Sequence, residues 1–275
     1  MPLMNHDFQR LCGFIHAQVG IKISDVKRTM LEGRLQKRMR VLGIATHRDY
    51  CDFLFSVQGQ RQELVHMIDA VTTNKTDFFR EPAHFNYLTQ RILPEMLPKC
   101  AGSEFKVWSA GCSTGEEPYT LAMVLREFLE TQPQAMRNWD ILASDISTRV
   151  LEQAQRAVYS EERIAPIAAH LRRKYLLRSR DSKASLVRIE PGLRKMLRFR
   201  RINFMDEDFG LNESFQIIFC RNVIIYFDKP TQEQLMQKFC RHLVSGGYLF
   251  LGHSESLHGF SVPLIQVAPT VYRRN

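Results

Sequence analysis

One stretch, "VWSAGCSTGEEPYTLAMVL" at residues 107–125, constrains the fold of this chain more than any other. An apolar strand that runs into a glycine turn and then into a helix is how the phosphate-binding loop of a nucleotide-binding sheet begins. Here the turn from Gly111 to Gly115 lacks the middle glycine of the dinucleotide motif G-x-G-x-x-G, and Glu116 and Glu117 stand where phosphates would meet the helix. These carboxylates would repel a pyrophosphate, so the pattern favours a ligand without phosphates.

Strands alternate with helices from residue 105 onward. The expected strands are 105–110, 139–145, 215–220, 246–252 and 264–273, and the expected helices are 117–130, 148–159 and 231–243. This alternation predicts an α/β domain of Rossmann-like type, with a mostly parallel sheet and helices on both faces. Ligands bind such sheets beyond the C-terminal ends of the strands.

Asp145 is expected to close the second strand, thirty residues after Gly115. A carboxylate at this position accepts hydrogen bonds from ribose hydroxyls, but the spacing exceeds the roughly 20 residues of the dinucleotide fingerprint, which weakens the case for NAD. S-adenosylmethionine suits the pattern better, because its sulfonium and ammonium groups are positive while its ribose and adenine still need an acid and an apolar slot. Glu116 and Glu117 also have a plainer interpretation as acids at a helix start, which leaves open which of them contacts the ligand.

Residues 1–72 are expected to form a small all-helical domain, and residues 73–103 a linker region with a helix that starts at Pro82. Within the first domain a helix is predicted from Ser24 to Gly43, with an apolar arc that packs against the domain core. Beside that arc lies a basic stripe, which has two interpretations: a solvated helix face, or a docking surface for an acidic helix. The stripe consists of Lys27, Arg34 and Arg38.

The charge of the chain is concentrated in one segment. The net charge is +9, yet residues 171–201 alone contain twelve Lys or Arg against two acids, so the rest of the chain sums to −1. Residues 185–191 and 196–204 alternate enough to be short strands around the turn at Pro191 and Gly192, and they predict an antiparallel β subdomain inserted at about 172–202 in the α/β domain, 104–275. Such a basic patch points to an acidic partner.

The six cysteines are spread singly, with no C-x-x-C pair and no ligand spacing that suggests zinc, so we expect reduced thiols and no metal. Cys112 in the glycine turn is a weak candidate nucleophile, because no histidine lies near it in the sequence to activate it. The chain has no apolar run of the roughly 20 residues needed to span a bilayer and no signal-peptide pattern, which predicts a soluble, cytoplasmic protein without membrane insertion.

Six motifs in chain order resemble the bacterial chemotaxis-receptor glutamate O-methyltransferases, the CheR family. They read "TNKTDFFRE", "VWSAGCSTGEEPYTLAM", "ASDIS", "RRINF", "IIFCRNVIIYFDKPTQEQ" and "GGYLFLGHSES". The resemblance covers nearly the whole chain, and the second and fifth motifs are specific to the family. It implies a methyltransferase that uses S-adenosylmethionine to form glutamate γ-methyl esters on chemoreceptors, with S-adenosylhomocysteine as the second product, for adaptation in signal transduction.

The resemblance also implies roles for individual residues. Arg80 and Tyr226 would lie nearest the transferring methyl group and would be the catalytic residues. The residues that would surround the cofactor are Asn74, Thr76, Arg80, Gly111, Glu117, Asp145, Asn203, Phe204, Arg221 and Asn222. Lys27, Arg34 and Arg38 would meet the acidic methylation helices of the receptor cytoplasmic domain.

The resemblance departs from some relatives at the basic insertion. Tethering members of the family bind a receptor C-terminal pentapeptide by adding it as a strand to their β subdomain. Their loop contains glycines, whereas this one reads "RSRDSKASLVRI" with none, so we expect electrostatic docking in place of a tether. The competing interpretation is a nucleic-acid methyltransferase whose basic insertion binds phosphates; the chain lacks the N/D-P-P-Y/F motif, a Pro-Cys nucleophile and an aromatic platform in the basic segment.

Overall fold

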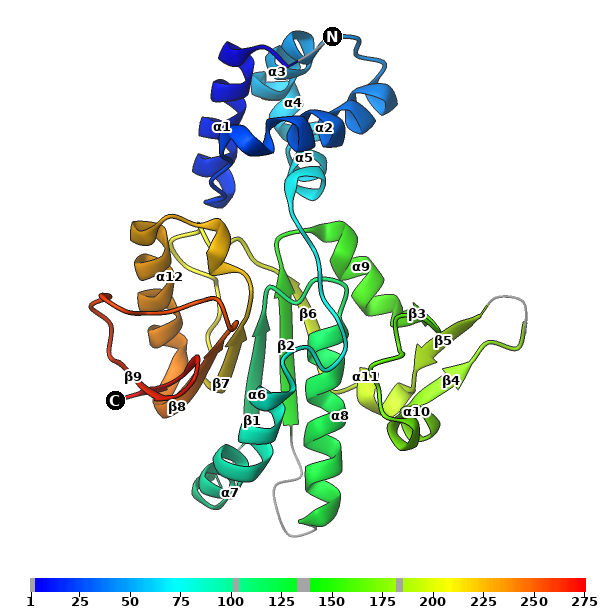
Figure 1. The fold of residues 1–275 in the computed structure, drawn as a ribbon, viewed down its shortest axis with the longest axis vertical. Coiled ribbons are helices and arrows are strands. Elements are labelled where there is room, and N and C mark those ends of the chain that lie inside the picture. The colour runs from blue at the N-terminus through cyan, green and yellow to red at the C-terminus, as the bar shows by residue number, and fades with distance from the viewer. Residues whose placement is uncertain (1–2, 101–103, 133–138, 182–184) are drawn as a thin grey trace.

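The computed structural model describes residues 3–100, 104–132, 139–181 and 185–275. A bundle of helices stands over one end of an α/β domain, and a single extended segment joins the two (Figure 1). None of the helices in the described residues is both long and apolar enough to cross a bilayer.

The N-terminal bundle has its own core. Its helices are α1 (Asn5–Val19), η1 (Asp25–Lys27), α2 (Arg28–Leu42), α3 (His47–Phe55), α4 (Val57–Gln62) and α5 (Leu64–Val71). On α2 the predicted apolar arc packs as expected, with Leu31, Leu35 and Met39 buried, and Gly43 ends the helix in the left-handed conformation at φ +68°. Ser24 precedes the short helix η1, and its side chain makes no capping hydrogen bond.

The connecting segment is helical after residue 81. It contains α6 (Pro82–Tyr87), the π-helical turn η2 (Leu88–Ile92), α7 (Leu93–Met96) and η3 (Leu97–Cys100). Pro82 occupies the first turn of α6, where its missing N–H costs no hydrogen bond.

The main sheet is parallel over most of its width. Its strands are β1 (Phe105–Ala110), β2 (Trp139–Asp145), β6 (Leu197–Arg201), β7 (Phe215–Cys220), β8 (Leu243–Leu251), β9 (Leu264–Ala268) and β10 (Val271–Arg274), in the order β6-β2-β1-β7-β8-β10-β9. Among the described strands of this sheet, only the pairs β8 with β10 and β10 with β9 are antiparallel. The predicted strands 105–110, 139–145 and 215–220 agree with β1, β2 and β7, whereas the predicted strand 264–273 is the hairpin of β9 and β10.

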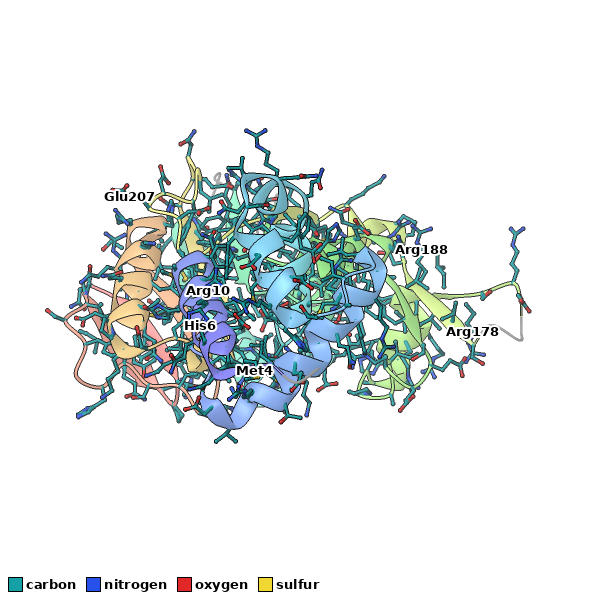
Figure 2. All side chains as sticks on the ribbon, turned by 90° about the horizontal axis from the view of Figure 1, so that it is seen from above. Met4, His6, Arg10, Arg178, Arg188 and Glu207 are labelled. Atoms are coloured by element: carbon teal, nitrogen blue, oxygen red, sulfur yellow. The ribbon has the colours of Figure 1, made fainter. Side chains whose placement is uncertain are left out.

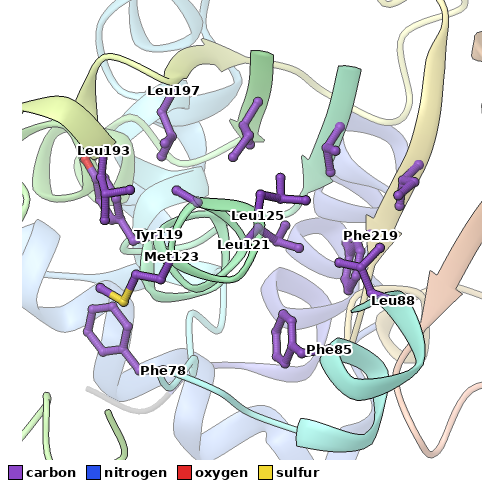
Figure 3. Packing of buried hydrophobic residues seen from close by; sticks show 14 of the residues in the cluster. Phe78, Phe85, Leu88, Tyr119, Leu121, Met123, Leu125, Leu193, Leu197 and Phe219 are labelled. Atoms are coloured by element: carbon purple, nitrogen blue, oxygen red, sulfur yellow. The ribbon is translucent and has the colours of Figure 1, made fainter. Parts of the chain in front are cut away.

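Helices cover both faces of this sheet, as predicted. One face packs against α8 (Glu116–Thr131), α6 and α9 (Thr148–Arg156), and the other against α12 (Lys229–His242). Figure 3 shows Leu121 and Leu125 of α8 between the strands and Phe85 of α6, with Phe219 of β7 on the same side. Along β1 the side chains alternate between the two layers, so Val107 joins the α8 layer and Trp108 the α12 layer.

The predicted helix 148–159 is too long. Ala157 takes φ +55° and ends α9 at Arg156, after which β3 (Val158–Ser160) begins a second, smaller sheet. Its strands run β3-β5-β4, all antiparallel, with β4 (Leu176–Arg178), β5 (Leu186–Ile189) and the helix α10 (Ala169–Tyr175).

The predicted antiparallel insertion therefore exists but is composed differently. Residues 197–201 are not part of it, because β6 pairs in parallel with β2 at the edge of the main sheet. The expected turn at Pro191 and Gly192 is the short helix α11 (Pro191–Arg194). Arg198 binds Asp140 and Glu213, so part of the basic segment is neutralised within the domain. Arg178 and Arg188 lie on the small sheet, well to one side of the helical bundle (Figure 2). Residues 182–184 of the predicted glycine-free loop lie outside the described residues.

Candidate active site

A cavity opens at the C-terminal ends of β1, β2 and β7, between the sheet, the linker and the helical bundle. It encloses about 860 Å³ of empty space, counted with its open mouth. All the residues predicted for the cofactor and for catalysis line it, namely Asn74, Thr76, Arg80, Gly111, Glu117, Asp145, Asn203, Phe204, Arg221, Asn222 and Tyr226. The sequence interpretation missed other lining residues, namely Val19, Ile21, Thr72, Thr73, Lys75, Ser113, Ile146, Ile202, Val223 and Phe227.

The glycine turn after β1 is shaped for close approach. Gly111 has φ +87°, and a Cβ there would lie 2.5 Å from Cγ2 of Val223, so no other residue fits without movement. The N–H groups of Gly111 and Cys112 both donate to the carbonyl of Ser144, at 2.8 Å each. Cys112 is buried, and burial raises the pKa of its thiol well above the usual value, which argues against the nucleophile considered from the sequence.

The two glutamates at the start of α8 point in different directions. Glu117 lines the cavity; its Oε1 accepts from Ser109 Oγ at 2.7 Å and its Oε2 from Arg221 Nε at 2.8 Å. Glu116, only 1% exposed, lies outside the cavity lining and forms an ion pair with Arg163. Glu116 is therefore a structural residue, and Glu117 is the glutamate available to a ligand.

Arg221 is the charged centre of the cavity's floor. Besides its bond to Glu117, its Nη1 donates to the carbonyl of Arg80 and to Nδ1 of His84, at 2.8 and 3.1 Å. Nη1 also lies 3.6 Å from Oε2 of Glu81. Because two carboxylates flank this guanidinium, the floor of the cavity carries no excess positive charge.

Asp145 ends β2, as predicted, with its carboxylate facing the glycine turn. Its Oδ2 accepts from the backbone N–H of Ser113 and its Oδ1 from that of Ser147, both at 2.9 Å. Burial raises the pKa of Asp145, and these backbone amides act in the opposite direction. Each carboxylate oxygen retains an acceptor site, so a pair of ligand hydroxyls can bind there.

The linker forms one wall of the cavity and is fastened to the glycine turn. Ser113 Oγ donates to the carbonyl of Asn74 at 2.9 Å, and Arg163 Nη2 donates to the carbonyl of Thr76 at 2.9 Å. Arg80 is half-buried, with Nη1 3.1 Å from the carbonyl of Lys75, and it lines the cavity.

The helical bundle completes the site. Asn203 Nδ2 donates to the carbonyl of Gln18 at 2.7 Å, and the N–H of Lys22 donates to the carbonyl of Tyr226 at 2.9 Å. Phe204 both lines the cavity and packs against Phe239, with ring centroids 5.6 Å apart.

The basic stripe is less exposed than the sequence suggested. Arg34 Nη1 donates to the carbonyl of Val71 at 2.6 Å, and Arg38 donates to both carboxylate oxygens of buried Glu63, at 2.9 and 2.6 Å. Lys27 is exposed, and its Nζ lies 5.7 Å from the ring centroid of Tyr226. The stripe thus begins at the cavity and continues along a brace inside the bundle.

One cluster beside the cavity has the composition of a metal site. Ligand atoms of Glu81, His84 and His253 lie within 4.8 Å of one another. However, the Nδ1 lone pair of His84 already accepts a hydrogen bond from Arg221, and a cation would lie beside that guanidinium. We interpret the cluster as part of the Arg221 network, and the absence of a metal stays a prediction.

The donor set of the cavity fits S-adenosylmethionine. Glu117 can bind a positively charged amine, Asp145 can bind ribose hydroxyls, and apolar side chains from both domains can hold a purine ring. The walls from the bundle and from β6 supply that apolar part, through Val19, Ile21, Ile202 and Phe204.

Comparison with known proteins bears on the same assignment. Residues 74–272 match the family model described as "CheR methyltransferase, SAM binding domain", and residues 6–72 match "CheR methyltransferase, all-alpha domain". The chain belongs to the CheR methyltransferase family. A chemotaxis protein methyltransferase of Borreliella burgdorferi is 40% identical over 272 residues, 98% of this chain and 94% of the relative. Those of Salmonella typhimurium and Escherichia coli are 36% and 35% identical over 272 residues, 99% of this chain and 91% and 92% of the relatives.

The family confirms the predicted reaction class and cofactor. This CheR-family chain is a methyltransferase that uses S-adenosylmethionine, and glutamate O-methylation in chemotaxis is the reaction of its family. The nucleic-acid alternative has no support. The fold prediction, an all-helical domain followed by a methyltransferase sheet with a small antiparallel sheet, is confirmed as well.

Proposed function

We propose that this chain methylates glutamate side chains of chemoreceptor cytoplasmic domains in the bacterial cytoplasm, with Arg80 and Tyr226 as the residues nearest the acceptor. The proposal rests on residues that are distant in the sequence and lie together in the structure. Residues from five of the six separated motifs meet on one cavity, within a chain that matches the CheR family along nearly its whole length.

The acceptor needs no general base. A glutamate γ-carboxylate has an unperturbed pKa of about 4.3 and is already ionised at neutral pH. S-adenosylmethionine, when bound, supplies a methyl group on a positively charged sulfonium. The residues of this chain therefore have to align an existing nucleophile and exclude water. This explains why the described cavity lining contains no histidine.

Arg80 and Tyr226 would orient the acceptor. The Arg80 guanidinium can bind a carboxylate with two hydrogen bonds, and the Tyr226 hydroxyl can donate a third or steer the methyl group. Binding the acceptor too strongly would stabilise the ground state as much as the transition state, so a half-exposed arginine suits this role.

The receptor would approach across the helical bundle. Lys27 is the exposed end of the basic stripe and lies against Tyr226, so an acidic helix docked on Lys27 would deliver its glutamate to the cavity mouth. We assign Arg34 and Arg38 a supporting part, because they brace the bundle behind that surface.

The small sheet offers a second basic surface, which could bind an acidic segment. Arg172, Arg173 and Arg178 line an open hollow together with Leu176 and Val187. We propose that this hollow attracts an acidic receptor segment through charge and that a pentapeptide tether is not used.

Transfer of labelled methyl groups to receptor cytoplasmic fragments tests the proposal. The fragments should be used with and without their C-terminal tails and with Glu→Gln changes at candidate sites, beside an RNA control. We expect base-labile label that disappears in the Gln fragments and does not depend on the tail sequence. Label on RNA alone, or on the Gln fragments, would overturn the assignment.

A further inference from the structure

Glu255 is a buried carboxylate outside the cavity that binds backbone amides of the loop after β7. It is 4% exposed and follows β8. Its Oε2 accepts from the N–H groups of Asn222 and Gly252, at 2.8 and 2.6 Å, and its Oε1 accepts from the N–H of Ile225 at 3.3 Å. A buried charge is tolerated only when its hydrogen-bonding capacity is met, and here backbone amides meet it.

The loop that Glu255 holds contains cavity residues on both sides of the anchor. Asn222 lines the cavity in the left-handed conformation, φ +59°, and Tyr226 ends the short helix η5 (Ile224–Tyr226). The two loops touch so closely that a Cβ on Gly252 would lie 2.8 Å from the backbone nitrogen of Asn222. The left-handed conformation of Asn222 persists only when the surrounding structure imposes it.

We infer that Glu255 is a positioning residue for methyl transfer, because it fixes the conformation of residues 221–226 and thereby the places of Asn222 and Tyr226. Each of its carboxylate oxygens holds a different end of this loop. Oε2 fixes the Asn222 end, which faces the cofactor part of the cavity, and Oε1 fixes the η5 end, which carries Tyr226.

This division predicts different outcomes for two substitutions. In Glu255→Gln the amide oxygen can keep the shorter bonds to Asn222 and Gly252, while the NH₂ group opposes the N–H of Ile225. Turnover should then fall at least about tenfold, with the affinity for S-adenosylhomocysteine within about threefold of wild type, since small misplacements of an aligning group cost that much. Glu255→Ala removes both anchors and should lower turnover and affinity together.

Glu190→Gln is the matched control. Glu190 also accepts from two backbone N–H groups, those of Gly192 and Leu193, at 2.6 and 2.7 Å, but it lies in the connection between the small sheet and β6 and does not line the cavity. It should lose thermal stability without losing turnover.

The experiment measures kcat and KM with receptor fragments, calorimetric affinity for S-adenosylhomocysteine, and thermal unfolding for wild type and the three variants. A tenfold loss of kcat confined to the Glu255 variants supports the inference. Wild-type kcat in Glu255→Gln, or an equal loss in Glu190→Gln, overturns it. The turnover arm rests on the proposed function: if the wild type itself does not methylate the fragments, that proposal fails, and the binding arm alone decides on Glu255, with unchanged affinity in Glu255→Ala counting against it.

Discussion

Replacing His84 with asparagine should make the stability of this protein less sensitive to acid. The imidazole is 2% exposed and lies beside the Arg221 guanidinium, with Nδ1 and Nη1 3.1 Å apart. Burial and that guanidinium lower the pKa of His84 from 6.5 to about 4, against the smaller opposing effect of the Glu81 carboxylate. Between about pH 4 and pH 6.5 the folded protein therefore keeps this ring neutral, whereas the unfolded chain protonates it.

The sign and size follow from proton linkage. Below pH 6.5 the unfolded state binds the extra proton, so the free energy of unfolding falls as the pH falls toward the folded pKa of about 4. Between pH 7.5 and pH 5 the loss from this one group is about 2 kcal/mol. Asparagine removes the titration and can still accept from Arg221 through its Oδ1, so the variant should lack that part of the loss even if it is less stable at pH 7.5.

Urea unfolding at several pH values between 5 and 7.5 measures the difference. The matched control is His258→Asn, the same substitution at an exposed histidine. If His84→Asn lost as much stability as the wild type between pH 7.5 and 5, the burial and charge argument for His84 would be refuted.

Three further substitutions test the cavity. Tyr226→Phe should lower turnover and keep cofactor affinity, and unchanged turnover in a methylation assay would remove Tyr226 from the mechanism. Glu117→Gln leaves the buried Arg221 guanidinium with one neighbouring carboxylate, that of Glu81, in place of two, so it should cost roughly 3 kcal/mol of unfolding free energy and weaken binding of S-adenosylhomocysteine; a calorimetric affinity equal to wild type would contradict its assigned role. Gly111→Ala would combine a left-handed φ of +87° with a Cβ 2.5 Å from Val223, so it should cost about 1–3 kcal/mol of unfolding free energy and also weaken binding of S-adenosylhomocysteine. Its control is Gly43→Ala, at φ +68° with open space around it, which should lower stability without changing that affinity. Equal affinities in the two variants would count against a close approach of the cofactor to residue 111.

Local patterns predicted the elements that carry the site. The run from the first strand into the glycine turn and α8 is contained in one window of sequence, so its strand, its turn and its acids could all be read in order. Asp145 could be placed for the same reason, since it is the last residue of an apolar strand. The direction of Glu116 could not, because its partner Arg163 lies 47 residues away and on no matching pattern.

Partners distant in the sequence explain the errors. Residues 158 and 159 belong to the predicted helix 148–159, yet they pair with β5 about thirty residues later. Alternation in residues 197–201 suggested an antiparallel ribbon, but β2 offered an open parallel edge, and Arg198 found Asp140 on that neighbour. The brace of Arg38 on Glu63 is likewise a contact between α2 and the turn residue that joins α4 to α5, and the helical pattern of α2 does not contain it.

The helical bundle supplies part of the cavity wall, which links receptor binding and cofactor binding, two properties that would be independent if each domain had one role. Val19 and Ile21 line the cavity, and the carbonyl of Gln18 receives the hydrogen bond from Asn203. The bundle that we propose as the receptor-binding surface therefore also lines the proposed cofactor cavity. On this proposal, exchanging the bundle with that of a relative to change the receptor would also replace Val19 and Ile21 in the cavity wall, so we expect cofactor affinity to change together with receptor choice.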